Sequence, residues 1–215
     1  DNQWDVEAPQ TTANLAAVPR LQRLCEQFGF PPTYLCTYEV VTSSDFRGTI
    51  AAYTSDGWAE VGAHLHPWST PPFDAVWDGG RAARPYPSEL PAELVARKLD
   101  RLTSVIAGRA GARPVSYRAG RWGLSPIQIG LLVSYGYRVD CSVTPGVSWQ
   151  GDIGLHEGGP DFTEAPQAPY VLSGDDPARA GDSGLLEVPV TILHVSQLMR
   201  RSRVLRRSYR RHRRS

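Results

Sequence analysis

Two histidines, His64 and His66, stand two residues apart at the end of a short, mostly apolar run. In an extended chain, side chains two residues apart point to the same side, so the two imidazoles could bind one cation. Neutral imidazole is the commonest nitrogen ligand of zinc in proteins. The spacing is therefore compatible with a metal site, in which one nitrogen of each ring should lie within about 3–3.5 Å of the other. Taken alone, however, the spacing favours a pair of ordinary surface histidines.

Charged residues also end other short apolar runs. Arg118 ends the run that begins at Val115, and Asp140 is the acidic residue of the run that begins at Tyr137. A further carboxylate, Asp1, is the first residue of the chain. A guanidinium beside a carboxylate lowers the pKa of the carboxyl group and restricts its rotamers, which suits a catalytic base. A structural ion pair between Arg118 and Asp140 on neighbouring strands is the alternative explanation.

These residues need a scaffold that brings separate segments together, and the apolar periodicity indicates which one. Helical spacing predicts helices at about 15–28, 46–54, 88–109 and 127–135. Apolar runs predict strands at about 32–41, 59–64, 115–118, 137–143 and 185–194, with long loops at 67–87 and 145–184. Alternating strands and helices imply parallel strands joined by crossover helices. In such folds the functional residues gather at the carboxyl ends of the strands.

Length and composition are those of one globular domain. The 215 residues can bury a substantial core, and 41% of them are apolar while 21% are charged. No apolar run approaches the roughly 18 residues that a membrane span needs. Because the chain opens on Asp1 without a methionine, we expect upstream sequence to have been removed. Three cysteines without metal-type spacing argue against a disulfide framework, and Cys25 and Cys36 are expected to be small buried apolar residues.

The C-terminal tail, residues 199–215, contains nine arginines and no acidic residue. The rest of the chain contains the other 14 of the 23 basic residues and all 22 acidic residues, so its net charge is about −8. Such a tail could bind nucleic acid or an anionic membrane surface. The favoured interpretation is a solvated helix, because Leu198, Val204 and Leu205 indicate a weak amphipathic helix that packs on the body.

Three segments carry the most informative motifs: Val61-Gly-Ala-His-Leu-His-Pro-Trp, Ser116-Tyr-Arg-Ala-Gly-Arg-Trp-Gly-Leu-Ser-Pro and Tyr137-Arg-Val-Asp-Cys-Ser-Val-Thr-Pro. Together they resemble the polysaccharide deacetylase family, the metal-dependent sugar N-deacetylases with the NodB-homology fold (carbohydrate esterase family four). The resemblance implies an α/β fold, an incomplete or distorted (β/α) barrel, over residues 1–198, truncated at both ends and followed by the Arg-rich tail. A subgroup linked to bacterial surface-polysaccharide loci shares the His-x-His-Pro-Trp pattern.

The resemblance also implies roles for the charged residues. Asp1 falls at the position of the family's catalytic base, whereas Gln3 stands where a metal-binding glutamate is expected. His64 and His66 would bind a divalent metal ion, for which zinc is the expectation. Arg118 would hold the carboxylate of Asp1.

Further roles concern the leaving group and the sugar. Asp140 would orient the general acid, which is either His194 or a residue beyond the end of the chain. Trp68, Arg121 and Trp122 would bind the substrate, since an indole suits the C–H face of a sugar ring. For Trp68 the alternative is that the indole only seals the mouth of the barrel.

The sequence therefore predicts a metal-dependent hydrolase that removes an N-acetyl group from an amino sugar of a polysaccharide or its precursor. The alternative is a catalytically degenerate carbohydrate-binding or scaffold domain with the same fold. Nucleic-acid binding through the tail is the least favoured of three hypotheses. A carbohydrate is the expected partner, and the cytoplasm of a bacterium is the expected location.

Overall fold

The computed structural model describes residues 11–77, 84–152, 154, 156 and 158–192. Several predictions made above fall on the remaining residues. The proposed base Asp1, the position of Gln3, the candidate acid His194 and the Arg-rich tail all lie outside the described residues. The proposed boundary between residues 1–198 and the tail also lies outside them.

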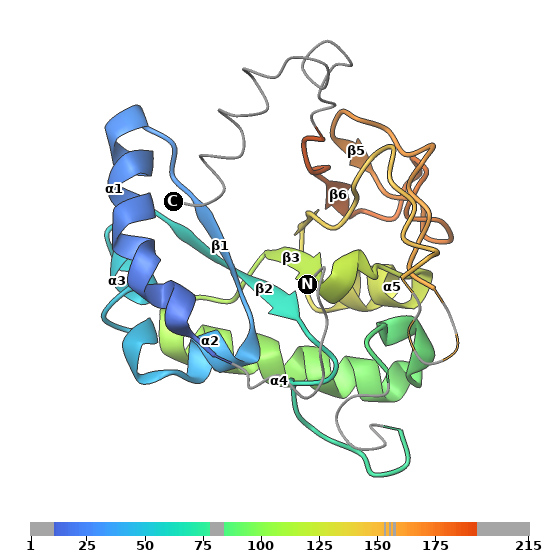
Figure 1. Cartoon of the computed structure of the whole chain (residues 1–215), viewed down its shortest axis with the longest axis horizontal. Helices are drawn as coiled ribbons and strands as arrows, with labels where there is room; N and C mark the ends of the chain where they lie inside the picture. Colours follow the sequence, from blue (N-terminus) through green and yellow to red (C-terminus); the bar gives the residue numbers. More distant parts are fainter. Residues whose placement is uncertain (1–10, 78–83, 153, 155, 157, 193–215) are drawn as a thin grey trace, which may run out of the picture.

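A mostly parallel sheet forms the centre of the molecule, with strand order β1-β2-β3-β4-β6-β5. Its strands are β1 Thr33–Cys36, β2 Glu60–Leu65, β3 Ser116–Ala119, β4 Val139–Asp140, β5 Tyr170–Val171 and β6 Leu186–Glu187. The neighbouring strands β1, β2, β3, β4 and β6 pair in parallel. The edge strand β5 pairs with β6 in the antiparallel direction. In the described part of the chain the sheet does not close, which confirms the expected incomplete α/β barrel (Figure 1).

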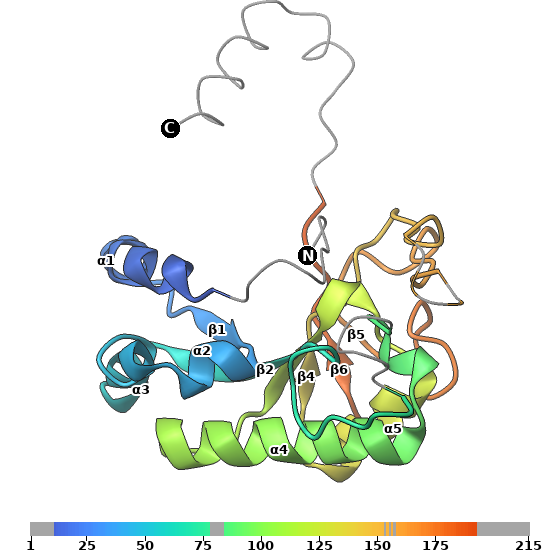
Figure 2. The same cartoon turned by 60° about the horizontal axis from the view of Figure 1, so that its bottom comes forward.

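Helices surround this sheet unevenly. Their bounds are η1 Ala13–Ala17, α1 Val18–Phe28, α2 Tyr38–Thr42, η2 Ser44–Phe46, α3 Ile50–Ser55, η3 Pro87–Glu89, α4 Ala92–Ala110, η4 Gly120–Trp122 and α5 Pro126–Ser134. Figure 2 shows α4 and α5 along one face of the sheet, while α1, α2 and α3 gather at the β1 end. The core lies between α4 and the sheet and contains Leu94, Leu99, Leu102, Ala63 and Leu65. These contacts fix the strand ends on which the candidate site is built.

The predicted strand at 32–41 is wrong in its second half. The strand ends at Cys36, and Tyr38–Thr42 forms the helix α2. The helical turn directs Val41 into the core, where it is fully buried with residues of α4. Packing against α4 therefore outweighs the strand preference of the adjacent β-branched residues.

Other predicted elements also have different bounds. The strand expected at 137–143 pairs only over Val139–Asp140, and the helix expected at 88–109 begins at Ala92. The helix expected at 46–54 begins only at Ile50, after the short 3-10 turn η2.

The strand expected at 185–194 pairs only over Leu186–Glu187. Beyond it, the N–H groups of Val188 and Val190 still donate to the carbonyls of Asp140 and Val143 at 2.8 and 2.9 Å. Two residues on one side then match three on the other, so the regular strand register is lost.

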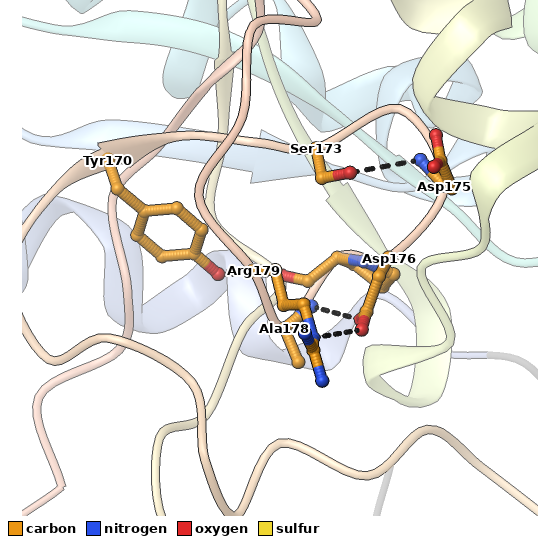
Figure 3. A network of polar contacts seen from close by, with 7 residues as sticks. Tyr170, Ser173, Asp175, Asp176, Ala178 and Arg179 are labelled. Atoms are coloured by element: carbon orange, nitrogen blue, oxygen red, sulfur yellow. Dashed lines mark hydrogen bonds and ion pairs between the residues drawn. The ribbon is translucent and has the colours of Figure 1, made fainter.

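The segment between β5 and β6 is an irregular loop held by its own polar groups (Figure 3). The carboxylate of Asp176 accepts a hydrogen bond from the Ala178 N–H and forms an ion pair with Arg179 at 3.1 Å. The Tyr170 hydroxyl donates to the Pro177 carbonyl at 2.6 Å. These bonds fold the loop that follows β5 back on itself.

In the segments that the structure describes, no helix has both the length and the apolar character to cross a lipid bilayer. All three cysteines are free thiols. Cys36 is buried as expected, whereas Cys25 and Cys141 are partly exposed.

Candidate metal and catalytic site

The two histidines at the end of β2 converge. The Nε2 atoms of His64 and His66 lie 2.9 Å apart, slightly closer than the predicted separation. His64 lies in β2, and His66 directly follows the last residue of this strand, Leu65. Because the backbone is extended, side chains two residues apart point to the same side, so both rings do so here. The geometry that one shared cation requires is therefore present, and the metal-binding role itself stays a prediction.

A backbone carbonyl sets the tautomer of His64. Its Nδ1 lies 3.0 Å from the carbonyl oxygen of Arg118, on the neighbouring strand β3. Because a carbonyl oxygen can only accept, Nδ1 carries the proton and Nε2 keeps its lone pair. Metal-binding histidines in proteins use the same arrangement, in which the distal nitrogen donates to a carbonyl or carboxylate.

Burial keeps both imidazoles neutral. It lowers the pKa of His64 well below its ordinary value, and it lowers the pKa of His66 to about 4. Neither ring is protonated at neutral pH, so each can offer a lone pair to a cation. The proximity of the two rings further opposes protonation of His64.

Close packing fixes the position of His66. Its ring stacks on the indole of Trp68 at a centroid distance of 4.3 Å, and the two residues are only 9% and 7% exposed. A Cβ added at Gly120 would lie 2.7 Å from Cδ2 of His66. Glycine is therefore required at this turn for the imidazole to fit. Trp68 supports His66, and its proposed contact with a sugar stays a prediction.

The pair of imidazoles fits a divalent cation. Two nitrogens 2.9 Å apart can both reach one cation at the usual metal–nitrogen distance of about 2.0–2.1 Å. Within the described residues, no group of three histidine, cysteine or acidic side chains could complete a metal site. The N-terminal acidic segment, which the resemblance places here, lies outside those residues.

Arg118 is held by an aromatic ring. Its guanidinium carbon lies 3.6 Å from the centroid of the Trp122 ring, and its buried Nε has no hydrogen-bond partner. Burial lowers the pKa of its guanidinium below the ordinary value of an arginine side chain. No ion pair joins Arg118 to Asp140, so the structural ion pair considered above is not formed between these two described residues. The proposed contact of Arg118 with Asp1 lies outside the described residues.

The turn after β3 has an unusual backbone. Arg121 and Trp122 both adopt left-handed conformations, with φ values of 50° and 61°. Residues with a Cβ rarely adopt such conformations, and those that do are often found at functional sites. The guanidinium of Arg121 lies 4.8 Å from the Tyr86 ring, and the Trp122 ring is nearly parallel to that of Trp149 at 6.1 Å. Their proposed roles in substrate binding stay predictions.

Sequence reasoning missed Glu187. This residue of β6 pairs in register with Asp140 of β4, both are fully buried, and the two carboxyl groups share a hydrogen bond. Burial raises the pKa of Asp140, and burial with the adjacent Asp140 raises the pKa of Glu187 to about 11. The signal was an acidic residue within an apolar run, because buried carboxyl groups are rare unless they have a partner.

A buried lysine anchors the loop that follows the histidines. Lys98 of α4, the only lysine of the chain, donates from Nζ to the carbonyls of Thr70 and Pro72 at 2.9 and 2.8 Å. Its Nζ also lies 4.9 Å from the centroid of the Phe73 ring. Through these contacts α4 fixes the loop that begins at Trp68.

Lys98→Met is expected to lower the free energy of unfolding by about 2 kcal/mol, because hydrogen bonds from a charged donor are lost and two carbonyls remain buried. Urea unfolding followed by tryptophan fluorescence measures this effect. Arg97→Met, at the adjacent exposed position of α4, is the matched control and should be nearly neutral. Equal stability of the two variants would contradict the anchoring role.

Comparison with known proteins identifies the fold. The chain resembles the structure of a polysaccharide deacetylase from Mycobacterium smegmatis, with a TM-score of 0.53 and 20% sequence identity over 81% of this chain and 46% of that one. Two more distant structures each have a TM-score of 0.45. One is a family 4 carbohydrate esterase from Streptomyces lividans, with 14% identity over 65% of this chain and 60% of that one. The other is a polysaccharide deacetylase of Bordetella bronchiseptica described as involved in O-antigen biosynthesis, with 18% identity over 81% and 51%.

The chain thus spans about half the length of the structures that it matches. No protein-family model and no curated protein sequence matches it. At this level of identity the likeness to the Mycobacterium smegmatis protein establishes the deacetylase-type fold and leaves the activity to be argued from the site.

Proposed function

We propose that this protein is a metal-dependent hydrolase that removes an N-acetyl group from an amino sugar of a polysaccharide or its precursor. The observation that carries the proposal is the pair of neutral imidazoles with Nε2 atoms 2.9 Å apart. They lie at the carboxyl edge of a parallel sheet with the fold of a polysaccharide deacetylase. This edge is where such folds place their catalytic residues.

His64 and His66 would hold the cation, with zinc as the proposed metal. When bound, such a cation polarises the acetyl carbonyl and lowers the pKa of a water molecule. The Trp68 indole stacked on His66 and the Arg118 carbonyl bonded to His64 keep both rings in position. The protein therefore supplies two ligands whose ring positions are already fixed.

The remaining steps are proposed to use the charged residues that the family resemblance singles out. The proposed base is Asp1, whose carboxylate takes the proton of the water that attacks the acetyl carbon. The carbon–nitrogen bond then breaks, acetate leaves, and the sugar amine receives a proton from the general acid. His194 is the candidate acid within this chain. Arg118 is proposed to hold Asp1, since within the described residues its guanidinium forms no ion pair with a carboxylate, although Asp140 is near enough to raise its pKa.

The sugar itself is proposed to contact the turn after β3. Trp122 offers an aromatic surface beside Trp149, and Arg121 offers hydrogen-bond donors suited to sugar hydroxyls or an acetamido oxygen. The left-handed backbone of both residues places their side chains on this turn in one defined arrangement.

One observation favours the alternative of a catalytically degenerate carbohydrate-binding domain. Gln3 occupies the position at which the related deacetylases are expected to carry a metal-binding glutamate. A neutral amide is a much weaker cation ligand than a carboxylate. In this alternative the aromatic residues still bind sugar and no hydrolysis takes place.

The two functions predict different results with purified protein. The deacetylase should release acetate from N-acetylglucosamine oligomers after loading with zinc or cobalt, and a chelator should abolish the release. Acetate release and elemental analysis measure both properties. Sugar binding by calorimetry that is insensitive to chelator, without turnover, would support the binding domain. Absence of both acetate and bound metal would refute the deacetylase proposal.

A further inference from the structure

A single peptide group stands between His64 and the buried carboxyl pair. Its oxygen, the carbonyl of Arg118, accepts the hydrogen bond from Nδ1 of His64 at 3.0 Å. Its nitrogen, the N–H of Ala119, donates to the hydroxyl oxygen of Ser142 at 2.9 Å. The peptide group at the end of β3 is therefore bonded on both sides, by the candidate metal ligand and by a serine of the next strand end.

Ser142 is in turn hydrogen-bonded to Asp140. The Ser142 hydroxyl donates to Oδ1 of Asp140 at 2.8 Å, and the Ser142 N–H donates to Oδ2 at 2.9 Å. Both carboxylate oxygens thus accept, which is the pattern of an ionised Asp140. Both residues are fully buried, so water does not compete for these bonds.

Glu187 completes the network. Its Oε1 accepts a hydrogen bond from the Val143 N–H at 3.1 Å, while its other oxygen is buried and has no donor. Since Asp140 is ionised and hydrogen-bonded to Glu187, the proton of the pair resides on Glu187 and points to Asp140. The pair therefore carries a single negative charge, buried behind the end of β3.

We infer that Asp140, Ser142 and Glu187 are positioning residues of His64, acting through the peptide group between Arg118 and Ala119. The buried charge polarises the Ser142 hydroxyl and, through the Ala119 N–H, makes the Arg118 carbonyl a stronger acceptor. Hydrogen bonds in series strengthen one another, by about 10–30% each in condensed phase. A stronger acceptor holds the proton on Nδ1 of His64 and raises the basicity of its Nε2 lone pair.

This arrangement performs the task of a carboxylate bonded directly to a metal-binding histidine. Here a serine and a peptide group lie between the carboxylate and the imidazole. Asp140 therefore acts on a metal ligand, in place of the acid-orienting role that the resemblance implies. The inference rests on the proposed metal site at His64 and His66.

Ser142→Ala tests the connection because it removes the bridging hydroxyl and leaves both ends in place. Titration of the metal-free protein with Co²⁺, followed by visible absorbance, should show an affinity about tenfold weaker than wild type. Ser116→Ala is the matched control, because Ser116 is a buried serine at the opposite end of β3 from Ala119, and its hydroxyl bonds to Glu60. It should bind Co²⁺ within about twofold of wild type.

A second measurement needs no metal. Nitrogen-15 NMR of the metal-free wild-type protein should show His64 with its proton on Nδ1, and this proton should exchange faster with solvent in Ser142→Ala. A wild-type His64 protonated on Nε2 would overturn the inference, even if Ser142→Ala does not fold. So would a folded Ser142→Ala with wild-type affinity and exchange.

The two proposals fail in different ways. A protein that shows the Ser142 effect on Co²⁺ affinity and releases no acetate would refute the deacetylase function and keep this inference. A protein that binds no Co²⁺ would refute the metal site, and the inference with it.

Discussion

His64→Ala is expected to abolish metal binding and to lower deacetylase activity by at least about a thousandfold. A cation that polarises a carbonyl supplies several kcal/mol of transition-state stabilisation, and each 1.36 kcal/mol corresponds to a tenfold change in rate. His64 contributes one of the two converging Nε2 atoms, so its removal leaves His66 as the one imidazole at this point. Acetate release and the zinc content of the purified variant measure the two effects.

His156→Ala is the control for this variant. His156 is an exposed histidine whose backbone N–H, rather than its ring, bonds to Glu89. It should retain full metal content and activity. A His64→Ala protein with wild-type zinc content would show that the metal, if any, binds elsewhere.

Glu187→Leu is expected to lower the free energy of unfolding by about 3–5 kcal/mol, because it leaves the buried charge of Asp140 without its carboxylic acid partner. Glu187→Gln is the matched variant. Its amide N–H₂ can donate to Asp140 as the carboxylic acid does, and its oxygen can accept from the Val143 N–H. Urea unfolding at pH 7 should therefore show a large loss for leucine and a small one for glutamine. Equal losses would contradict the assignment of the proton to Glu187.

The same pair makes the stability depend on pH. The pKa of Glu187 is raised from 4.5 to about 11 by burial and by Asp140, so the folded protein retains a proton that the unfolded chain releases. The stabilising contribution is complete below pH 4.5 and is lost as the pH rises toward 11. The slope for one proton is at most about 1.4 kcal/mol per pH unit.

Glu187→Gln removes this proton, so its unfolding free energy should fall less steeply with pH than that of wild type. Urea unfolding of both proteins at several pH values between 5 and 8 provides the comparison. Parallel pH profiles would show that Glu187 does not carry the proton in the folded state.

Much of the scaffold was predictable because its signals are local. The alternation of apolar strands with amphipathic helices predicted the parallel sheet, and the spacing of His64 and His66 on a strand predicted that their rings converge. The helix α4 lies within about a residue of its predicted carboxyl end, since its apolar periodicity is long and regular. The error at 32–41 arose where packing against α4 favours a helix, and the error at 185–194 arose where the segment after Glu187 loses its regular register with the β4 segment.

The sequence by itself determined which residues lie at the carboxyl ends of the strands, because strand periodicity and chain order depend on neighbours in the chain. It could not show which of those residues touch. The order β4-β6-β5 places Glu187 beside Asp140, and the register of β2 with β3 places the Arg118 carbonyl against His64. The charge and proton of a buried side chain depend on partners that only the sheet brings together. The tautomer of His64 and the proton on Glu187 were therefore decided by the tertiary structure.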